Sequence, residues 1–126
     1  MTARTPEELH RLIAAAVSDG DIDAYLSLYE PGAALAKRGG GVAVGADEIR
    51  AEIAPFLALR GTLTVRTTNV VRGGDVALLH SRGSFTGVGP DGSQVEVPEH
   101  DAAEVARRQP DGAWLFLVNN PWGSAG

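Results

Sequence analysis

The chain has 126 residues, of which 44% are hydrophobic and 21% charged, with a formal net charge of −5 and no cysteine. This length and composition are typical of a globular protein, and we expect one domain over residues 1–126. The absence of cysteine excludes disulfides and thiolate metal sites, and the negative charge argues against nucleic acid as a partner. No apolar run approaches the roughly 20 residues of a membrane-spanning helix.

The chain opens with a helix signal and not with the charged and apolar regions of a secretory leader, so we expect a cytoplasmic protein. Thr5, Pro6 and Glu8 have the spacing of a capping box. A helix that ends at Asp19-Gly20 follows, and His10 is expected on its exposed side, where it would be inert. The apolar stripe of this helix consists of Leu9, Leu12, Ile13, Ala16 and Val17.

Two more helices are expected before the pattern changes. Asp21 can cap a short second helix that carries Tyr25 and Tyr29 and ends at Pro31-Gly32. A short strand over 33–37 and a glycine-rich loop then lead to a third helix at about 46–59. The glycines of the loop match neither the dinucleotide fingerprint nor the Walker motif, so no phosphate site is predicted there.

After Gly61 apolar and polar residues alternate with a period of two, which predicts strands. We expect them at 62–72, 76–86 and about 94–108, separated by glycine-rich turns. The last strand is apolar from Trp114 to Val118, as if buried on both faces. Three helices followed by four antiparallel strands predict an α+β fold in which helices cover one face of a sheet.

Two stretches of the chain resemble a known family. Residues 18–53 contain the patterns GD-x-D-x-x-x-x-L-Y and G-x-x-x-I-R, and the tail 103–123, AEVARRQPDGAWLFLVNNPWG, is similar to the ending of SnoaL-like and SgcJ-like proteins. Together the chain resembles the NTF2-like superfamily of ketosteroid isomerases and SnoaL-type polyketide cyclases over about 7–123. The resemblance implies a cone: three N-terminal helices packed on a curled, mainly antiparallel sheet around one deep apolar pocket.

In the isomerases the pocket holds a carboxylate base on the first strand, a tyrosine on the first helix and a neutral carboxylic acid on the third long strand. The matching positions here are Lys37, Ile13 and Glu104. Two of the three roles are therefore lost, and isomerisation by that route is not expected. If both face the pocket, Lys37 and Glu104 would form an ion pair, because unpaired buried charges are costly. The alternative is that Lys37 points to solvent and Glu104 lies on the outer face.

Glu104 and His100 share one face of the 94–108 strand with alanines, as a pocket wall would. Asn119 stands where the related subgroup often has an acid, and an amide can anchor a ligand without acting as a base. Tyr25 and Trp122 suit either a pocket rim or the core. We therefore expect three catalytic candidates, Glu104, His100 and Lys37, and five ligand-binding candidates, Tyr25, Phe56, His80, Asn119 and Trp122.

Three functions stay open. The first is a cofactor-independent acid–base enzyme of the cyclase or isomerase type, acting on a hydrophobic polyketide-like metabolite. The second is a non-catalytic ligand-binding or accessory protein of a biosynthetic pathway. The third is a module that forms a homodimer through the outer face of the sheet. No cofactor and no metal are expected, since the three histidines lack ligand spacing. The 62–72 strand would contribute to a polar dimer interface with Thr64, Arg66, Thr68, Val70 and Arg72.

Overall fold

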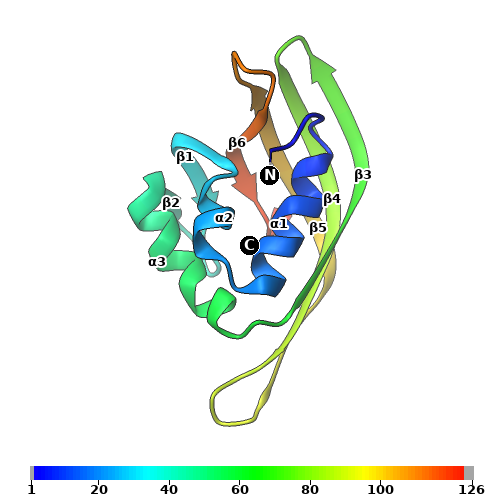
Figure 1. Cartoon of the computed structure of the whole chain (residues 1–126). Coiled ribbons are helices and arrows are strands. Elements are labelled where there is room, and N and C mark those ends of the chain that lie inside the picture. The colour runs from blue at the N-terminus through cyan, green and yellow to red at the C-terminus, as the bar shows by residue number, and fades with distance from the viewer. Residues whose placement is uncertain (1, 124–126) are drawn as a thin grey trace.

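A computed structural model describes residues 2–123 of the chain. Three helices pack on one six-stranded sheet (Figure 1). The helices are α1 (Glu8–Asp19), α2 (Ile22–Leu26) and α3 (Gly45–Ala58). The strands are β1 (Tyr29–Ala36), β2 (Val42–Val44), β3 (Thr62–Gly73), β4 (Val76–Val88), β5 (Gln94–Arg108) and β6 (Trp114–Asn120).

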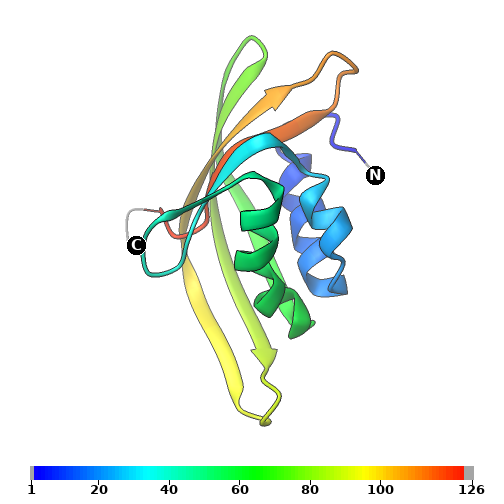
Figure 2. The ribbon, with the colours of Figure 1, turned by 90° about the vertical axis from the view of Figure 1, so that its left-hand side faces the viewer.

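The strands follow the order β2-β1-β6-β5-β4-β3, and every neighbouring pair is antiparallel except β1 with β6. The sheet curls around the three helices, which all lie on its concave side (Figure 2). The expected α+β cone, with helices on a curled and mainly antiparallel sheet, is confirmed. No helix within residues 2–123 has the length and apolar character needed to cross a membrane.

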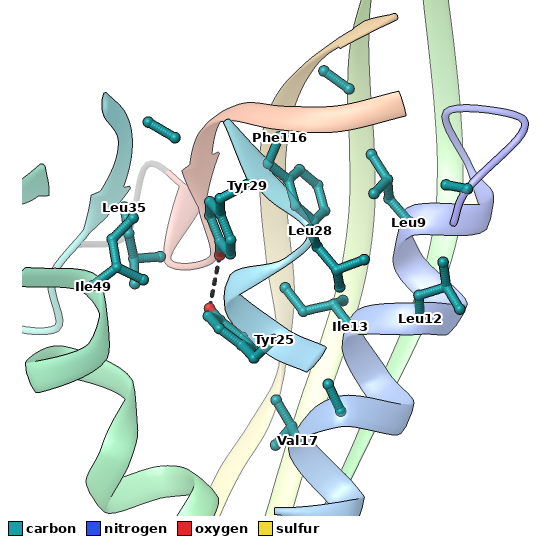
Figure 3. Close-up of a cluster of buried hydrophobic side chains, with 14 of the residues drawn as sticks. Leu9, Leu12, Ile13, Val17, Tyr25, Leu28, Tyr29, Leu35, Ile49 and Phe116 are labelled. Carbon is teal, nitrogen blue, oxygen red and sulfur yellow. Dashed lines mark hydrogen bonds between the residues drawn. The ribbon is translucent and has the colours of Figure 1, made fainter. Parts of the chain in front are cut away.

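The predicted capping box forms only in part, because α1 begins at Glu8 with Glu7 at its N-cap and the Glu8 carboxylate does not bond the Thr5 amide. The Glu8 amide donates to Thr5 Oγ1 at 3.4 Å, and the Glu8 carboxylate accepts from the Arg4 amide at 3.3 Å. Gly20, with φ of 66°, closes the helix in the left-handed conformation that glycine adopts readily. The apolar side of α1 then packs into the core, together with Tyr25, Leu28, Tyr29, Leu35, Ile49 and Phe116 (Figure 3).

The second helix is shorter than expected, and β1 begins at Tyr29. Tyr29 is therefore a strand residue, and Pro31-Gly32 lies inside the strand and does not end a helix. The pairing of β1 with β6 is irregular between Tyr29 and Ala34, so the missing amide of Pro31 falls where the regular ladder is interrupted. The short β2 was expected to be loop, because three residues are too few to show a period.

β3 and β6 each contain a bulge, and the residues after it point to the opposite side of the sheet from the side that strict alternation predicts. On β3, Thr67 pairs with Ser81 but Asn69 pairs with His80, so Thr68 is an extra residue. Val70 consequently packs against the core. The prediction that Val70 faces outward was wrong.

Arg72 follows Val70 on the same side of β3, with its guanidinium carbon 4.9 Å from the centre of the Trp114 ring. On β6, the register shifts between the partners of Val105 and Ala106, which leaves Leu117 unpaired. Val118 then points outward and is 41% exposed. The apolar run of β6 is thus buried on one face only, in contrast to the expectation.

Candidate functional site

A cavity of about 130 Å³ lies between the helices and the concave face of the sheet. One buried water takes about 10–15 Å³ of a cavity volume measured in this way. The cavity therefore has room for about ten water-sized, non-hydrogen atoms. Residues from all three helices and from five strands line it. Most of the lining is apolar: Ile13, Val17, Leu35, Ala36, Ile53, Phe56, Leu63, Val65, Phe85, Val97, Ala102 and Phe116.

A buried carboxylate lies in this apolar wall. Glu104 on β5 is 4% exposed, and its two oxygens have separate partners. Oε1 is 2.5 Å from His10 Nε2 on α1, and Oε2 accepts a hydrogen bond from Ser81 Oγ on β4 at 3.0 Å. All three side chains line the cavity. The second ring nitrogen of His10, Nδ1, is 2.5 Å from Thr67 Oγ1 on β3.

His10 corrects a prediction. It was expected on the exposed side of α1, but it is 3% exposed and is the partner of Glu104. The spacing of His10 could have predicted its burial. His10 lies three residues before Ile13 and seven before Val17, so all three share one face of the helix. Ser81 and Thr67 were also missed, since serine and threonine on a strand carry no distinctive pattern.

Two tyrosines and an amide form a second polar group of the site. The hydroxyls of Tyr25 and Tyr29 are 2.7 Å apart and point toward one another (Figure 3). Asn119 Nδ2 donates to the Tyr29 hydroxyl at 2.7 Å. Tyr25 and Asn119 line the cavity as expected, but Tyr25 is 2% exposed and so is part of the core and not only of a rim. Tyr29 was missed as a site residue because it was placed on the wrong element.

Burial keeps both tyrosines protonated. Loss of solvent is the main cause that raises the pKa of Tyr25 well above its ordinary value, and the neighbouring Tyr29 and the Glu52 carboxylate add to it. Burial also raises the pKa of Tyr29, and this outweighs the lowering effect of its hydrogen bonds with Tyr25 and Asn119. The pair is therefore a set of neutral hydroxyl donors at neutral pH.

His100 and Trp122 lie at another part of the cavity wall. Their rings are stacked, with centroids 5.5 Å apart and planes within 4°. His100 Nδ1 is 2.9 Å from the carbonyl oxygen of Pro98, and Nε2 is 2.6 Å from that of Pro121. Because carbonyl oxygens only accept, both bonds form together only when both ring nitrogens carry hydrogen.

Phe56 also lines the cavity, as expected, and it contacts aromatic rings on two sides. It packs edge-on against Phe85 with centroids 5.9 Å apart and lies 6.5 Å from the ring of Trp122. The guanidinium carbon of Arg38 is 5.4 Å from the centre of the Trp122 ring on the loop side. Aromatic surface thus connects α3, β4 and the C-terminal turn around the cavity.

Two predicted site residues lie elsewhere. Lys37 is exposed and does not line the cavity, and Glu104 pairs with His10 in its place. The pair considered between Lys37 and Glu104 does not form: Lys37 lies just past the end of β1 and is exposed, as in the alternative, whereas Glu104 is buried and not on the outer face. His80 is on the outer face of β4 and also does not line the cavity, which does not fit the predicted ligand contact. Within residues 2–123, no group of three or more His, Cys, Asp or Glu side chains could hold a metal ion.

Comparison with known proteins identifies the family. A model described as the SnoaL-like domain matches residues 9–115. The chain belongs to the SnoaL-like family. The predicted resemblance to SnoaL-like and NTF2-like proteins is thereby confirmed, and the family and fold support a small-molecule-binding NTF2-like protein. Among curated proteins, none matches this chain.

Solved structures share the fold of this SnoaL-like chain. One, provisionally assigned as a calcium/calmodulin-dependent protein kinase type II association domain from Thiobacillus denitrificans, has a TM-score of 0.77 at 18% identity and covers 95% of each chain. A ketosteroid isomerase-like protein from Erwinia carotovora atroseptica has a TM-score of 0.73 at 22% identity, over 90% of this chain and 88% of that one. An NTF2-like protein with a cystatin-like fold from Novosphingobium aromaticivorans has a TM-score of 0.73 at 21% identity, over 90% and 77%. At these identities the likeness concerns the fold alone.

Proposed function

We propose that this protein binds a compact hydrophobic cyclic metabolite, such as a polyketide-like compound, and catalyses a cofactor-independent acid–base reaction on it, of the cyclase or isomerase type. The observation that carries the proposal is the Glu104 carboxylate in a cavity that is otherwise mostly apolar. Burying a carboxylate and its partner costs free energy that a hydrophobic pair would not. Such groups are concentrated at functional sites, where they exchange protons with a ligand.

Each residue of this group has a distinct role in the proposal. Glu104 takes and returns the proton, because each of its oxygens has one hydrogen bond and keeps a further lone pair for a ligand. His10 positions the carboxylate and connects it through Nδ1 to Thr67. His100 and Trp122 supply a flat aromatic wall against which a ring can stack.

Proton exchange at carbon tests the catalytic part. In deuterated buffer, the wild type should accelerate the exchange of the α-hydrogens of 1-tetralone, a ketone of eleven non-hydrogen atoms, followed by NMR. Glu104→Gln keeps the shape but removes the base, and should slow exchange by about 10²–10⁴-fold. The matched control is His80→Gln, which changes a polar residue on the outer face of β4 and should leave the rate unchanged.

A second candidate function is non-catalytic ligand binding, as an accessory protein of a biosynthetic pathway. It is favoured by the fact that both oxygens of Glu104 already have partners within the protein. A wild type that binds the ketone but leaves its α-hydrogens unexchanged would contradict the catalytic proposal and favour this one.

The outer face of the sheet supports a homodimer as the working form. Residues paired in register place one apolar side chain on each of the six strands. We call this set the outer row, and it consists of Val44, Ala34, Val118, Val105, Leu78 and Val71. Four of its members are between 40% and 55% exposed in the single chain. A continuous apolar strip of this kind marks an interaction surface, and a second copy of the chain would cover it with an identical row.

A further inference from the structure

The hydrogen bonds between Tyr25, Tyr29 and Asn119 leave one hydrogen without an acceptor. Asn119 donates to the Tyr29 oxygen, and the two hydroxyls share one further bond. Each hydroxyl carries one hydrogen, but only one of the two can lie between the oxygens. The other hydroxyl hydrogen is therefore free, whichever tyrosine donates to the other.

The location of the three side chains determines where this hydrogen can go. Tyr25 and Asn119 line the cavity, whereas Tyr29 lies behind them in the core. With Tyr29 donating to Tyr25, the Tyr25 hydrogen is left over at the cavity wall. Among residues 2–123, the one hydrogen bond of the Tyr25 hydroxyl is that with Tyr29, and Tyr25 lines the cavity, so a ligand there can accept this hydrogen. A donor directed into an apolar cavity calls for an acceptor on the ligand.

We propose that the Tyr25 hydroxyl donates a hydrogen bond to an acceptor oxygen of the ligand, so that the cavity selects compact cyclic ketones over hydrocarbons of the same shape. The inference rests on the proposed binding of a cyclic metabolite, and it requires no catalysis. The proposed hydrogen bond also determines where the ligand oxygen lies relative to the Glu104 carboxylate. Asn119, which holds the tyrosine pair, is the register partner of Glu104 across β5 and β6. A ketone held at Tyr25 thus has its oxygen beside the strand pair that carries the carboxylate.

The test compares two ligands that differ in one oxygen. NMR titration measures the dissociation constants of 1-tetralone and of tetralin, which has the same ring system without the carbonyl. The wild type should prefer the ketone, and Tyr25→Phe should reduce this preference by about threefold to tenfold, as the loss of one hydrogen bond predicts. Tetralin binding should change little.

Tyr29→Phe is the matched control, because it removes the same atom from the same pair. In this variant the hydrogen of Tyr25 cannot go to Tyr29, so the preference for the ketone should persist. Both variants lose one buried hydroxyl, and a general loss of structure would affect them alike. Thermal unfolding of both variants checks this point.

Three results would overturn the inference. The first is a wild type that binds the two compounds equally, or neither. The second is a preference that survives Tyr25→Phe, which would mean that another group of the cavity, and not the Tyr25 hydroxyl, donates to the ketone oxygen. The third is an equal loss in both variants. The proposed catalysis is judged separately, since a protein with the ketone preference and without α-hydrogen exchange would refute only the catalytic proposal.

Discussion

Glu104 and Val105 are neighbours on β5 and point to opposite faces of the sheet. Each has the polarity that is usual for the other face. The charged residue is 4% exposed and faces the helices, whereas the apolar one belongs to the outer row. In a sheet covered on one side, apolar side chains usually face the helices and polar ones face solvent. This exchange of roles is the reason why we propose a ligand site on the inner face and a homodimer interface on the outer face.

The two faces also differ in how their polar groups are held. On the inner side, Glu104 has His10 and Ser81 as fixed partners in a nearly dry environment. On the outer side, Arg82 pairs with Glu99 and Asp101 at 3.0 and 3.3 Å, and all three are at least partly exposed. Exposed pairs of this kind contribute little to stability, whereas a buried pair is costly to break. Substitutions on the two faces should therefore have different consequences.

The largest effect on stability is expected from breaking the buried pair of His10 and Glu104. Glu104→Ala leaves His10 buried without its partner and should lower the free energy of unfolding by about 3–5 kcal/mol, measured by urea denaturation. Replacing both partners, with His10→Leu and Glu104→Leu together, should recover a large part of this loss, because the surrounding cavity wall is apolar. A double variant that is less stable than Glu104→Ala would show that the pair stabilises the fold by its own interaction.

The second effect concerns the inner tyrosines at high pH. The unfolded chain ionises tyrosine near pH 10, whereas the folded-state pKa values of Tyr25 and Tyr29 are raised. Above pH 10 the unfolded state therefore binds fewer protons. Stability should fall by about 1.4 kcal/mol per pH unit for each tyrosine until the folded-state pKa is passed.

Absorbance at 295 nm can follow this ionisation, because the chain has only these two tyrosines. The folded protein should show no tyrosinate signal as the pH passes 10, and the protein in urea should show the full signal. Ionisation of the folded protein near pH 10 would mean that the inner face admits water, in contradiction to the structure.

The smallest effect is expected on the outer face and on assembly alone. Leu78→Lys places a charge in the middle of the outer row and should raise the dissociation constant of the homodimer by roughly tenfold to a hundredfold. Sedimentation should then show the 13.1 kDa chain at micromolar concentration. Ala15→Lys, an exposed change on α1 at the other side of the sheet, is the control. A wild type that is monomeric at the same concentration would refute the dimer.

Local signals were sufficient for much of the fold. The capping box, the change of period after Gly61 and the glycine-rich turns located α1, α3 and the four long strands, because each signal acts within a few residues. The inner face of β5 was also predicted, with His100 and Glu104 on one side. The alternation holds there because the pairing of β5 with β4 is regular from His100 to Glu104.

The errors occur where the outcome depends on distant contacts. A bulge changes the face of every residue after it in the strand. The extra residues are Thr68 on β3 and Leu117 on β6, and neither residue type is a recognisable signal for a bulge. His10 was misplaced because the environment of a helix residue depends on what packs against it. The partner of Glu104 could not be found for the same reason, since ninety-four positions separate the two residues.

The position of β6 has a consequence for biosynthesis. Among the strands of residues 2–123 it is synthesised last, yet it lies between β1 and β5 and joins β2-β1 to the β5-β4-β3 meander. While residues 114–120 are still inside the ribosome, the nascent chain can form its helices and its meander but cannot complete the sheet. Completion of the sheet therefore requires the synthesis of β6, and until then the exposed edges of β1 and β5 are available to chaperones.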